Sequence, residues 1–169
     1  MKSLLIVFSY HHNNTRKIAE VIAKVLDAKI MKPQEINPEE LQEYDLVGFG
    51  SGIYSAKHHR TLLDLADKLP QVSYIKSFIF STAALTSEKK LTKDHSTLRG
   101  KLQSKGYVIV DDFQCKGFNT NSFMRYLGGM NKGRPNVEDL RHAKEFAEAL
   151  RQELQSMKPE RSIARSIEQ

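Results

Sequence analysis

A continuous apolar run near the start of the chain, followed by a polar turn and an amphipathic helix, most limits the folds open to this sequence. Leu4–Phe8 carries no polar side chain, which predicts a strand buried on both faces of a sheet. An apolar helical face follows, formed by Ile18, Val21, Ile22, Val25 and Leu26. Strand-then-helix units of this kind build parallel sheets, so we expect an α/β fold.

The same alternation continues along the chain. Further strands are predicted at 29–31, 46–50, 78–80 and 107–110. Helices are predicted at 58–69, around Leu91, His95, Leu98 and Leu102, and at 137–154. Right-handed crossovers then give a doubly wound five-stranded parallel sheet of order 2-1-3-4-5 with helices on both faces. Such sheets bind ligands beyond the carboxyl ends of the strands, where the strand order reverses.

Length and composition favour one soluble domain. The chain has 169 residues, 40% of them hydrophobic and 27% charged, which excludes a disordered or fibrous protein. We assign residues 1–156 to the domain and 157–169 to a C-terminal tail. Cys115 cannot form an internal disulfide, and we find no signal segment or membrane span, so a cytoplasmic location is expected. The net charge of +6 favours anionic partners.

The loop between the first strand and the first helix is the strongest candidate site. Backbone N–H groups and the positive end of the helix dipole can converge there on a phosphate, and hydroxyl and amide side chains add hydrogen-bonding groups. The candidate residues are Ser9, Tyr10, His11, Asn13, Asn14 and Thr15. The alternative is that Asn14 or Thr15 only caps the helix.

Several segments resemble flavodoxins, small proteins that bind FMN. The first loop is similar to the family's phosphate loop, Ser or Thr followed by two variable residues and Gly-Asn-Thr. A second loop is similar to the one that lies against the flavin ring in a microbial branch of the family. The segments that carry the resemblance are Phe8–Ala19, Gly48–His59, Phe80–Ala84, Phe113–Thr120 and Gly128–Pro135.

The resemblance implies noncovalent FMN binding by three loops. The first loop would hold the phosphate, and the third would contribute Thr82, Ala83 and Ala84. The second would lie against the ring through Ser51, Gly52, Ile53, Tyr54, Ser55 and Ala56. Tyr54 is the candidate to cover one ring face, and Phe118 is a second.

The sequence departs from the family pattern at three loop positions. Asn13, Ala56 and Ala84 stand where glycine is expected. Asparagine tolerates a positive φ, whereas alanine at such a position costs about 1 kcal/mol. Flavodoxins flip a peptide of the second loop when the flavin is reduced, and two alignments place that flip at Ala56 or at Gly52.

The resemblance implies an electron carrier that serves redox protein partners. Because the chain is basic, we expect those partners to present an acidic face. Two alternatives remain: an FMN-dependent NAD(P)H or quinone reductase on the same fold, and a binding module that has lost FMN. The carrier needs no catalytic side chain, so the sequence leaves open whether the protein is an enzyme.

Other patterns indicate less. A response-regulator receiver is excluded because Ser51 stands where its phospho-acceptor aspartate would be. The pairs His11-His12 and His58-His59 lack metal-ligand spacing and are interpreted as loop polarity near an anion. Cys115 is interpreted as a structural residue. The segment 114–135 is interpreted as a long functional or docking loop.

That segment contains four cations and no acid: Lys116, Arg125, Lys132 and Arg134. We interpret it as a basic rim around the flavin site, which explains the charge better than a nucleic-acid patch does.

Overall fold

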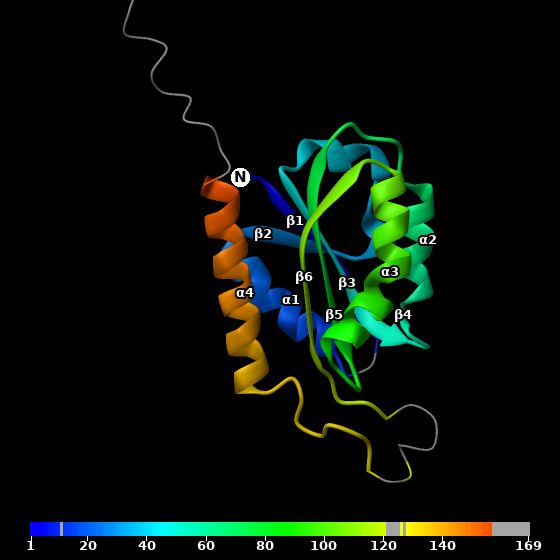
Figure 1. Ribbon diagram of the computed structural model, residues 1–169, viewed down its shortest axis with the longest axis vertical. Coiled ribbons are helices and arrows are strands. Elements are labelled where there is room, and N and C mark those ends of the chain that lie inside the picture. Colours follow the sequence, from blue (N-terminus) through cyan, green and yellow to red (C-terminus); the bar gives the residue numbers. More distant parts are fainter. Residues whose placement is uncertain (11, 121–125, 127, 157–169) are drawn as a thin grey trace, which may run out of the picture.

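The computed structural model describes residues 1–10, 12–120, 126 and 128–156, which alternate between strands and helices (Figure 1). The predicted tail 157–169 lies outside the described residues. The strands are β1 (Ser3–Phe8), β2 (Ala28–Met31), β3 (Leu46–Tyr54), β4 (Lys57–His58), β5 (Ile75–Ala83) and β6 (Tyr107–Lys116). The helices are α1 (Asn14–Leu26), α2 (Arg60–Lys68), α3 (Glu88–Ser104) and α4 (Val137–Ser156), with short 3-10 turns at Pro33–Glu35 and Pro38–Glu43.

The parallel sheet has the order β2-β1-β3-β5-β6, which confirms the predicted doubly wound topology. β3 lies at the centre, paired with β1 through Phe8↔Ser51 and with β5 through Gly52↔Thr82. The strand order reverses between β1 and β3, so their carboxyl ends flank the expected ligand position.

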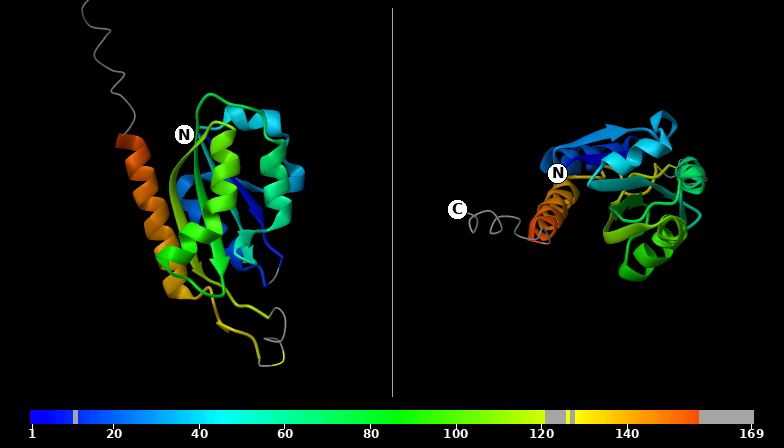
Figure 2. Two further views of the ribbon diagram at one scale, coloured as in Figure 1. Left: turned by 45° about the vertical axis from the view of Figure 1, so that its right-hand side comes forward. Right: turned by 90° about the horizontal axis from the view of Figure 1, so that it is seen from above.

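Helices cover both faces of the sheet (Figures 1 and 2). α1 and α4 pack on one face around Ile18, Ile22 and Leu150, and α2 and α3 pack on the other around Leu62, Leu98 and Leu102. Alternate side chains of β5 feed the two cores, with Phe78 and Phe80 in the first and Ile79 in the second. None of the described helices is long and apolar enough to cross a membrane.

The sequence did not predict the short strand β4. It pairs antiparallel with the end of β3, in a two-residue hairpin whose central residues Ser55 and Ala56 have φ of 49° and 60°. Turns that need two positive φ values are usually signalled by Asn-Gly or Asp-Gly, and this chain has neither there. The five predicted parallel strands are confirmed, and β4 adds a short antiparallel strand that was not predicted.

β5 and β6 are also longer than predicted. β5 extends to Ala83 and β6 to Lys116, whereas the apolar runs end at Phe80 and Val110. Ser81 and Thr82 are buried within β5 despite their polar side chains. The predicted loop from Gln114 therefore begins later, after Lys116.

Candidate functional site

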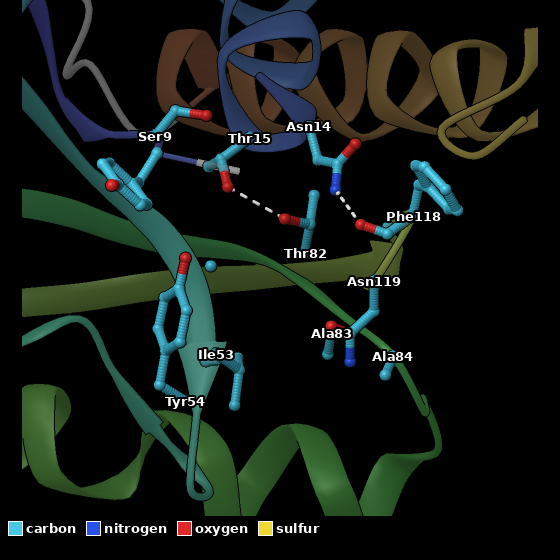
Figure 3. Close-up of a pocket in the computed structure, with 13 residues that line it drawn as sticks. Ser9, Asn14, Thr15, Ile53, Tyr54, Thr82, Ala83, Ala84, Phe118 and Asn119 are labelled. Carbon is cyan, nitrogen blue, oxygen red and sulfur yellow. Dashed lines mark hydrogen bonds between the residues drawn. The ribbon is translucent and has the colours of Figure 1, made fainter. Parts of the chain in front are cut away.

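A cleft opens at the carboxyl ends of β1, β3, β5 and β6, next to the start of α1 (Figure 3). Its wall combines hydroxyl groups, aromatic rings and small residues from segments far apart in the sequence. The lining residues are Ser9, Tyr10, Asn14, Thr15, Gly52, Ile53, Tyr54, Thr82, Ala83, Ala84, Gly117, Phe118 and Asn119.

Hydroxyl groups gather where α1 begins. Thr15 Oγ1 lies 2.9 Å from Thr82 Oγ1, and both side chains are buried. Ser9 Oγ accepts a hydrogen bond of 3.3 Å from the backbone N–H of Arg16. Because Asn14 and Thr15 are the first helical residues and line the cleft, the positive end of the α1 dipole lies at this wall.

The capping alternative for Asn14 and Thr15 is not what the structure shows. The N-cap is Asn13, in the left-handed conformation at φ 53°, and its side chain makes no cap hydrogen bond. Its conformation agrees with the expectation that asparagine replaces glycine there at little cost. The side chains of Asn14 and Thr15 instead bond to Phe118 and Thr82 across the cleft.

Asn14 ties α1 to the segment that follows β6. Its Nδ2 donates to the carbonyl oxygen of Phe118 at 2.8 Å, while its buried Oδ1 has no hydrogen-bond partner among the described residues. Gly117 permits this approach, since an added Cβ would lie 2.9 Å from Asn14 Nδ2 and 3.1 Å from Thr82 Cβ. A glycine is therefore required at the end of β6 to keep this part of the wall in place.

Aromatic rings form the other side of the cleft. Tyr54 is half-buried, and its hydroxyl points toward the side of the cleft that carries Thr15 (Figure 3). Burial, helped by the neighbouring Tyr10, raises the pKa of Tyr54, so its hydroxyl stays protonated at neutral pH. The Tyr54 ring meets His59 edge-on at 5.3 Å, and His59 stacks on Phe8 at 3.9 Å.

The segment after β6 folds back onto the cleft loops. Asn131 Nδ2 donates to the carbonyl oxygen of Ala84 at 2.7 Å, and Asn119 forms a β-bridge with Met130. The ring of Phe118 packs 4.4 Å from that of His12. The described part of this predicted docking loop is therefore a wall of the cleft.

Most of the predicted site residues meet in this cleft. From the three loops these are Ser9, Tyr10, Asn14, Thr15, Gly52, Ile53, Tyr54, Thr82, Ala83 and Ala84, and Phe118 joins them from the segment after β6. His11 lies outside the described residues.

The other predicted residues do not line the cleft. Asn13 borders a neighbouring groove, Ser55 and Ala56 form the hairpin turn, and Ser51 is buried with its hydroxyl bonded to His58. Ala84 is not at a positive φ, so its replacement of the expected glycine carries no such strain, whereas Ala56 does have a positive φ.

Two wall residues were missed by the sequence-based site, Gly117 and Asn119. Both follow β6, which ends at Lys116 and not at the predicted Val110. A ligand cleft is expected at the carboxyl ends of the strands. Had the end of β6 been predicted correctly, Gly117 and Asn119 would have been expected at the cleft.

Of the predictions made for the histidine pairs and for Cys115, the one for His58 is wrong. His58 is not a polar loop residue near an anion, because it is 2% exposed and faces away from the cleft onto α3. No group of metal-binding side chains occurs in the described ranges. Burial, together with the nearby Asp139, raises the pKa of Cys115 to about 12, so its thiol is protonated and its assignment as a structural residue is supported.

The basic segment is less free than its sequence suggests. Arg134 Nη1 lies 2.8 Å from Asp139 Oδ1 at the start of α4, so one cation is paired from outside the segment. Arg125 lies outside the described residues. Lys116 and Lys132 remain as described cations of the proposed rim.

Comparisons with known proteins agree with this geometry. The model of the family described as "Flavodoxin domain" matches residues 5–117. An uncharacterized protein of Methanocaldococcus jannaschii is 44% identical over 150 residues, which cover 89% of this chain and 98% of that protein.

Solved flavodoxins share the fold at low identity. A flavodoxin from the domain Archaea has a TM-score of 0.60 at 16% identity, covering 92% of this chain and 99% of that one. Oxidised Flavodoxin 2 from Bacillus cereus has a TM-score of 0.66 at 16% identity, covering 90% and 99%. A flavodiiron core from Synechocystis has a TM-score of 0.63 at 14% identity, covering 93% of this chain and 37% of that one.

Proposed function

Because this chain belongs to the flavodoxin domain family, we propose that its cleft binds FMN noncovalently and that the protein carries electrons between redox partners. The observation that carries the proposal is the meeting of the first two residues of α1, the Thr15–Thr82 hydroxyl pair and the Tyr54 ring in one cleft at the switch point of the sheet.

The donor set of this wall fits a flavin mononucleotide. Ser9, Thr15 and Thr82 offer hydroxyl groups, and the α1 terminus offers positive backbone potential, which together suit a phosphate. The buried Oδ1 of Asn14 has no partner among the described residues and can accept a hydrogen bond from a sugar hydroxyl. FMN, when bound, supplies the redox chemistry, because no protein side chain here accepts two electrons.

The chain's own residues then bind, orient and shield. Thr15 and Thr82 hold the phosphate end, and the half-buried Tyr54 covers part of the ring with its protonated hydroxyl as a donor. Gly52 lies under the Tyr54 ring, since an added Cβ would be 3.2 Å from the Tyr54 hydroxyl. The absence of a side chain at Gly52 thus leaves room beside the aromatic wall.

We further propose that the electron partner presents an acidic face toward the cleft rim. The net charge of +6 and the described cations Lys116 and Lys132 support this. Steering by opposite charges speeds encounter and is screened over about 10 Å at 0.1 M salt. Electron transfer to an acidic partner protein should therefore slow as salt increases, and an unchanged rate would remove the acidic partner from the proposal.

A second candidate function is an FMN-dependent NAD(P)H reductase, and one observation favours it. A groove adjoins the cleft, shares Ser9 and Tyr10 with it, and carries Arg16 and Lys32 on its walls. A nicotinamide nucleotide needs such a place for its phosphates beside the flavin. Oxidation of NADPH by the FMN-loaded protein with a quinone acceptor would support the reductase, and its absence leaves the carrier.

Thr15→Ala tests the binding proposal directly. The variant removes one charge-assisted hydrogen bond to the phosphate, so FMN affinity should fall about tenfold or more. Riboflavin lacks the phosphate, and its affinity should not change. Thr92→Ala, on the exposed face of α3, is the matched control. Equal losses for the two flavins would contradict a phosphate contact at Thr15.

A further inference from the structure

A second polar site lies on the opposite face of the sheet from the cleft. Ser51 and Ser81 each precede a residue that lines the cleft, and successive side chains of a strand point to opposite faces. Both hydroxyls are fully buried, and each bonds to a buried imidazole: Ser51 Oγ to His58 Nδ1 at 2.9 Å, and Ser81 Oγ to His95 Nε2 at 2.8 Å. With Asp112 these residues form what we call the histidine cluster.

The hydrogen bonds around His95 have a defined direction. Gln114 Nε2 donates to Ser81 Oγ at 3.1 Å, so the hydroxyl proton of Ser81 is available for His95 Nε2. His95 Nδ1 then donates to Asp112 Oδ2 at 3.3 Å. Both ring nitrogens of His95 thus have a hydrogen-bond partner.

Asp112 is held as a carboxylate. Its burial would raise its pKa, but the hydrogen bond from His95, the charge that His95 carries when protonated, and the ion pair with Arg99 outweigh burial and lower the pKa. The neighbouring carboxylate, Asp94, accepts from Lys90 Nζ at 3.3 Å and from Gln114. Two carboxylates of the cluster's surroundings, Asp94 and Asp112, are therefore each paired with a cation.

The hydrogen bonds link Ser81, His95 and Asp112 in the order found in the catalytic triad of a hydrolase. Ser81 is too deeply buried, however, to act as a nucleophile. A nucleophilic serine must meet a substrate carbonyl, and Ser81 is 0% exposed beneath α3. An imidazole beside a carboxylate can also act as a proton acceptor, because the carboxylate stabilises its protonated form. This role requires no access for a substrate.

His58 limits how many protons the cluster can hold. Its ring centroid lies 5.0 Å from that of His95, it is 2% exposed, and its Nε2 has no hydrogen-bond partner among the described residues. Burial, and then the charge that His95 carries when protonated, place the pKa of His58 well below its usual value. The charged groups that surround the pair are Lys90, Asp94 and Arg99 on α3 and Asp112 on β6.

We propose that His95 is a buried proton acceptor that becomes charged when negative charge enters the cleft on the other face of the sheet, while His58 restricts the pair to one proton. The proposal rests on the proposed FMN function. Were FMN bound in the cleft, its reduction by two electrons from a donor protein and one proton from water would add one negative charge there. A second proton from water binds His95 Nε2, which turns from acceptor to donor toward Ser81.

The sheet geometry makes this coupling strong. Ser51, which bonds to His58, and the cleft residue Gly52, which lies beside the Tyr54 ring, are consecutive in β3, so the histidine cluster and the ring side of the cleft lie on opposite faces of one strand. The residues between them are buried and exclude water, so charges on the two faces are poorly screened from each other.

The number of protons taken up per two electrons tests the proposal. We would measure the midpoint potential of the FMN-loaded protein from pH 5 to 9 and obtain that number from its slope. The wild-type protein should take up one proton more than His95→Gln over part of this range. Asp112→Asn, which keeps the shape but loses the carboxylate, should lose the same proton, and the exposed His142→Gln is the matched control.

A second readout needs no flavin. Nitrogen NMR of the FMN-free protein should show His95 neutral with its proton on Nδ1 near pH 8, and His58 neutral down to lower pH than His142. Equal proton numbers in wild type and both cluster variants, with FMN bound normally, would overturn this proposal alone. Failure of the wild type to bind FMN would instead overturn the proposed function and the coupling with it.

Discussion

The two faces of the same strand ends are built in opposite ways. On the α1 face, the polar groups of the cleft are held by few mutual hydrogen bonds, and Tyr10 at its rim is 73% exposed. On the α3 face, His95 bonds to both Ser81 and Asp112, and Ser81 and His95 are fully buried beneath the helix. Consecutive residues of one strand thus line the cleft on one side and belong to a self-contained network on the other.

This difference has an energetic meaning. Polar groups that bond to each other in a buried cluster stabilise the fold, and losing one partner leaves the others unpaired. Polar groups that await a ligand contribute less to folding and more to affinity. Substitutions on the two faces should therefore separate stability from flavin binding.

Asp112→Ala should have the largest effect on stability. It leaves the imidazole of His95 and the guanidinium of Arg99 without their carboxylate, and we expect a loss of about 3 kcal/mol in the free energy of unfolding. Thr82→Val, on the cleft face, removes one hydroxyl contact and should cost about 1 kcal/mol. Urea denaturation of both variants measures the contrast, and equal losses would abolish the distinction between the faces.

Gly117→Ala should have the next largest effect, a loss of about 2 kcal/mol in the free energy of unfolding. The added Cβ would press on Asn14 and Thr82 in a packed wall. It should weaken FMN binding as well. Gly100→Ala, in an exposed part of α3 with no atom within 4 Å of the added Cβ, is the control and should stabilise the protein by up to about 1 kcal/mol. Similar stability of the two variants would show that the wall around Gly117 can make room for a Cβ.

The buried histidine on the α3 face should also make the stability of the protein depend on pH. The folded-state pKa of His58 lies well below its usual value, so below about pH 6.5 the unfolded chain binds a proton that the folded protein does not. Stability should fall with decreasing pH by up to about 1.4 kcal/mol per pH unit from this group. His58→Gln should flatten that slope and His142→Gln should not; a slope unchanged in His58→Gln would mean that His58 is not the group responsible.

The smallest effect concerns the hairpin beside the cleft. Ala56 has a φ of 60°, so Ala56→Gly should stabilise the protein by about 1 kcal/mol. Ala84 has no positive φ, and Ala84→Gly should give no such gain. Thermal unfolding distinguishes them, and a gain at Ala84 alone would show that the strain was assigned to the wrong loop.

The sequence was sufficient where one local pattern decides one element. The apolar run Leu4–Phe8 and the helical spacing after Thr15 define β1 and α1, and the carboxyl end of β1 then places the first loop at the cleft. The topology follows from the alternation and the handedness of the crossovers. The strand order, the fold class and most cleft residues could therefore be predicted.

The sequence was insufficient where polar side chains pack against one another. Ser81, Thr82 and Gln114 lie within strands although they interrupt the apolar runs, because partners distant in the sequence satisfy them. His95 fits the helical spacing of a core residue, but spacing cannot identify Asp112 as its partner. The hairpin turn at Ser55 and Ala56 carries no turn signal at all.

The central claim is that the α1 face of the sheet is a site for the phosphate and ring of FMN. The most direct test is a titration of the flavin-free protein with FMN and with riboflavin, followed by flavin fluorescence. We predict that FMN binds at least about tenfold more tightly, because riboflavin leaves the hydroxyls and the α1 terminus without an anion. Equal affinity for the two flavins, or no binding of either, would contradict the account.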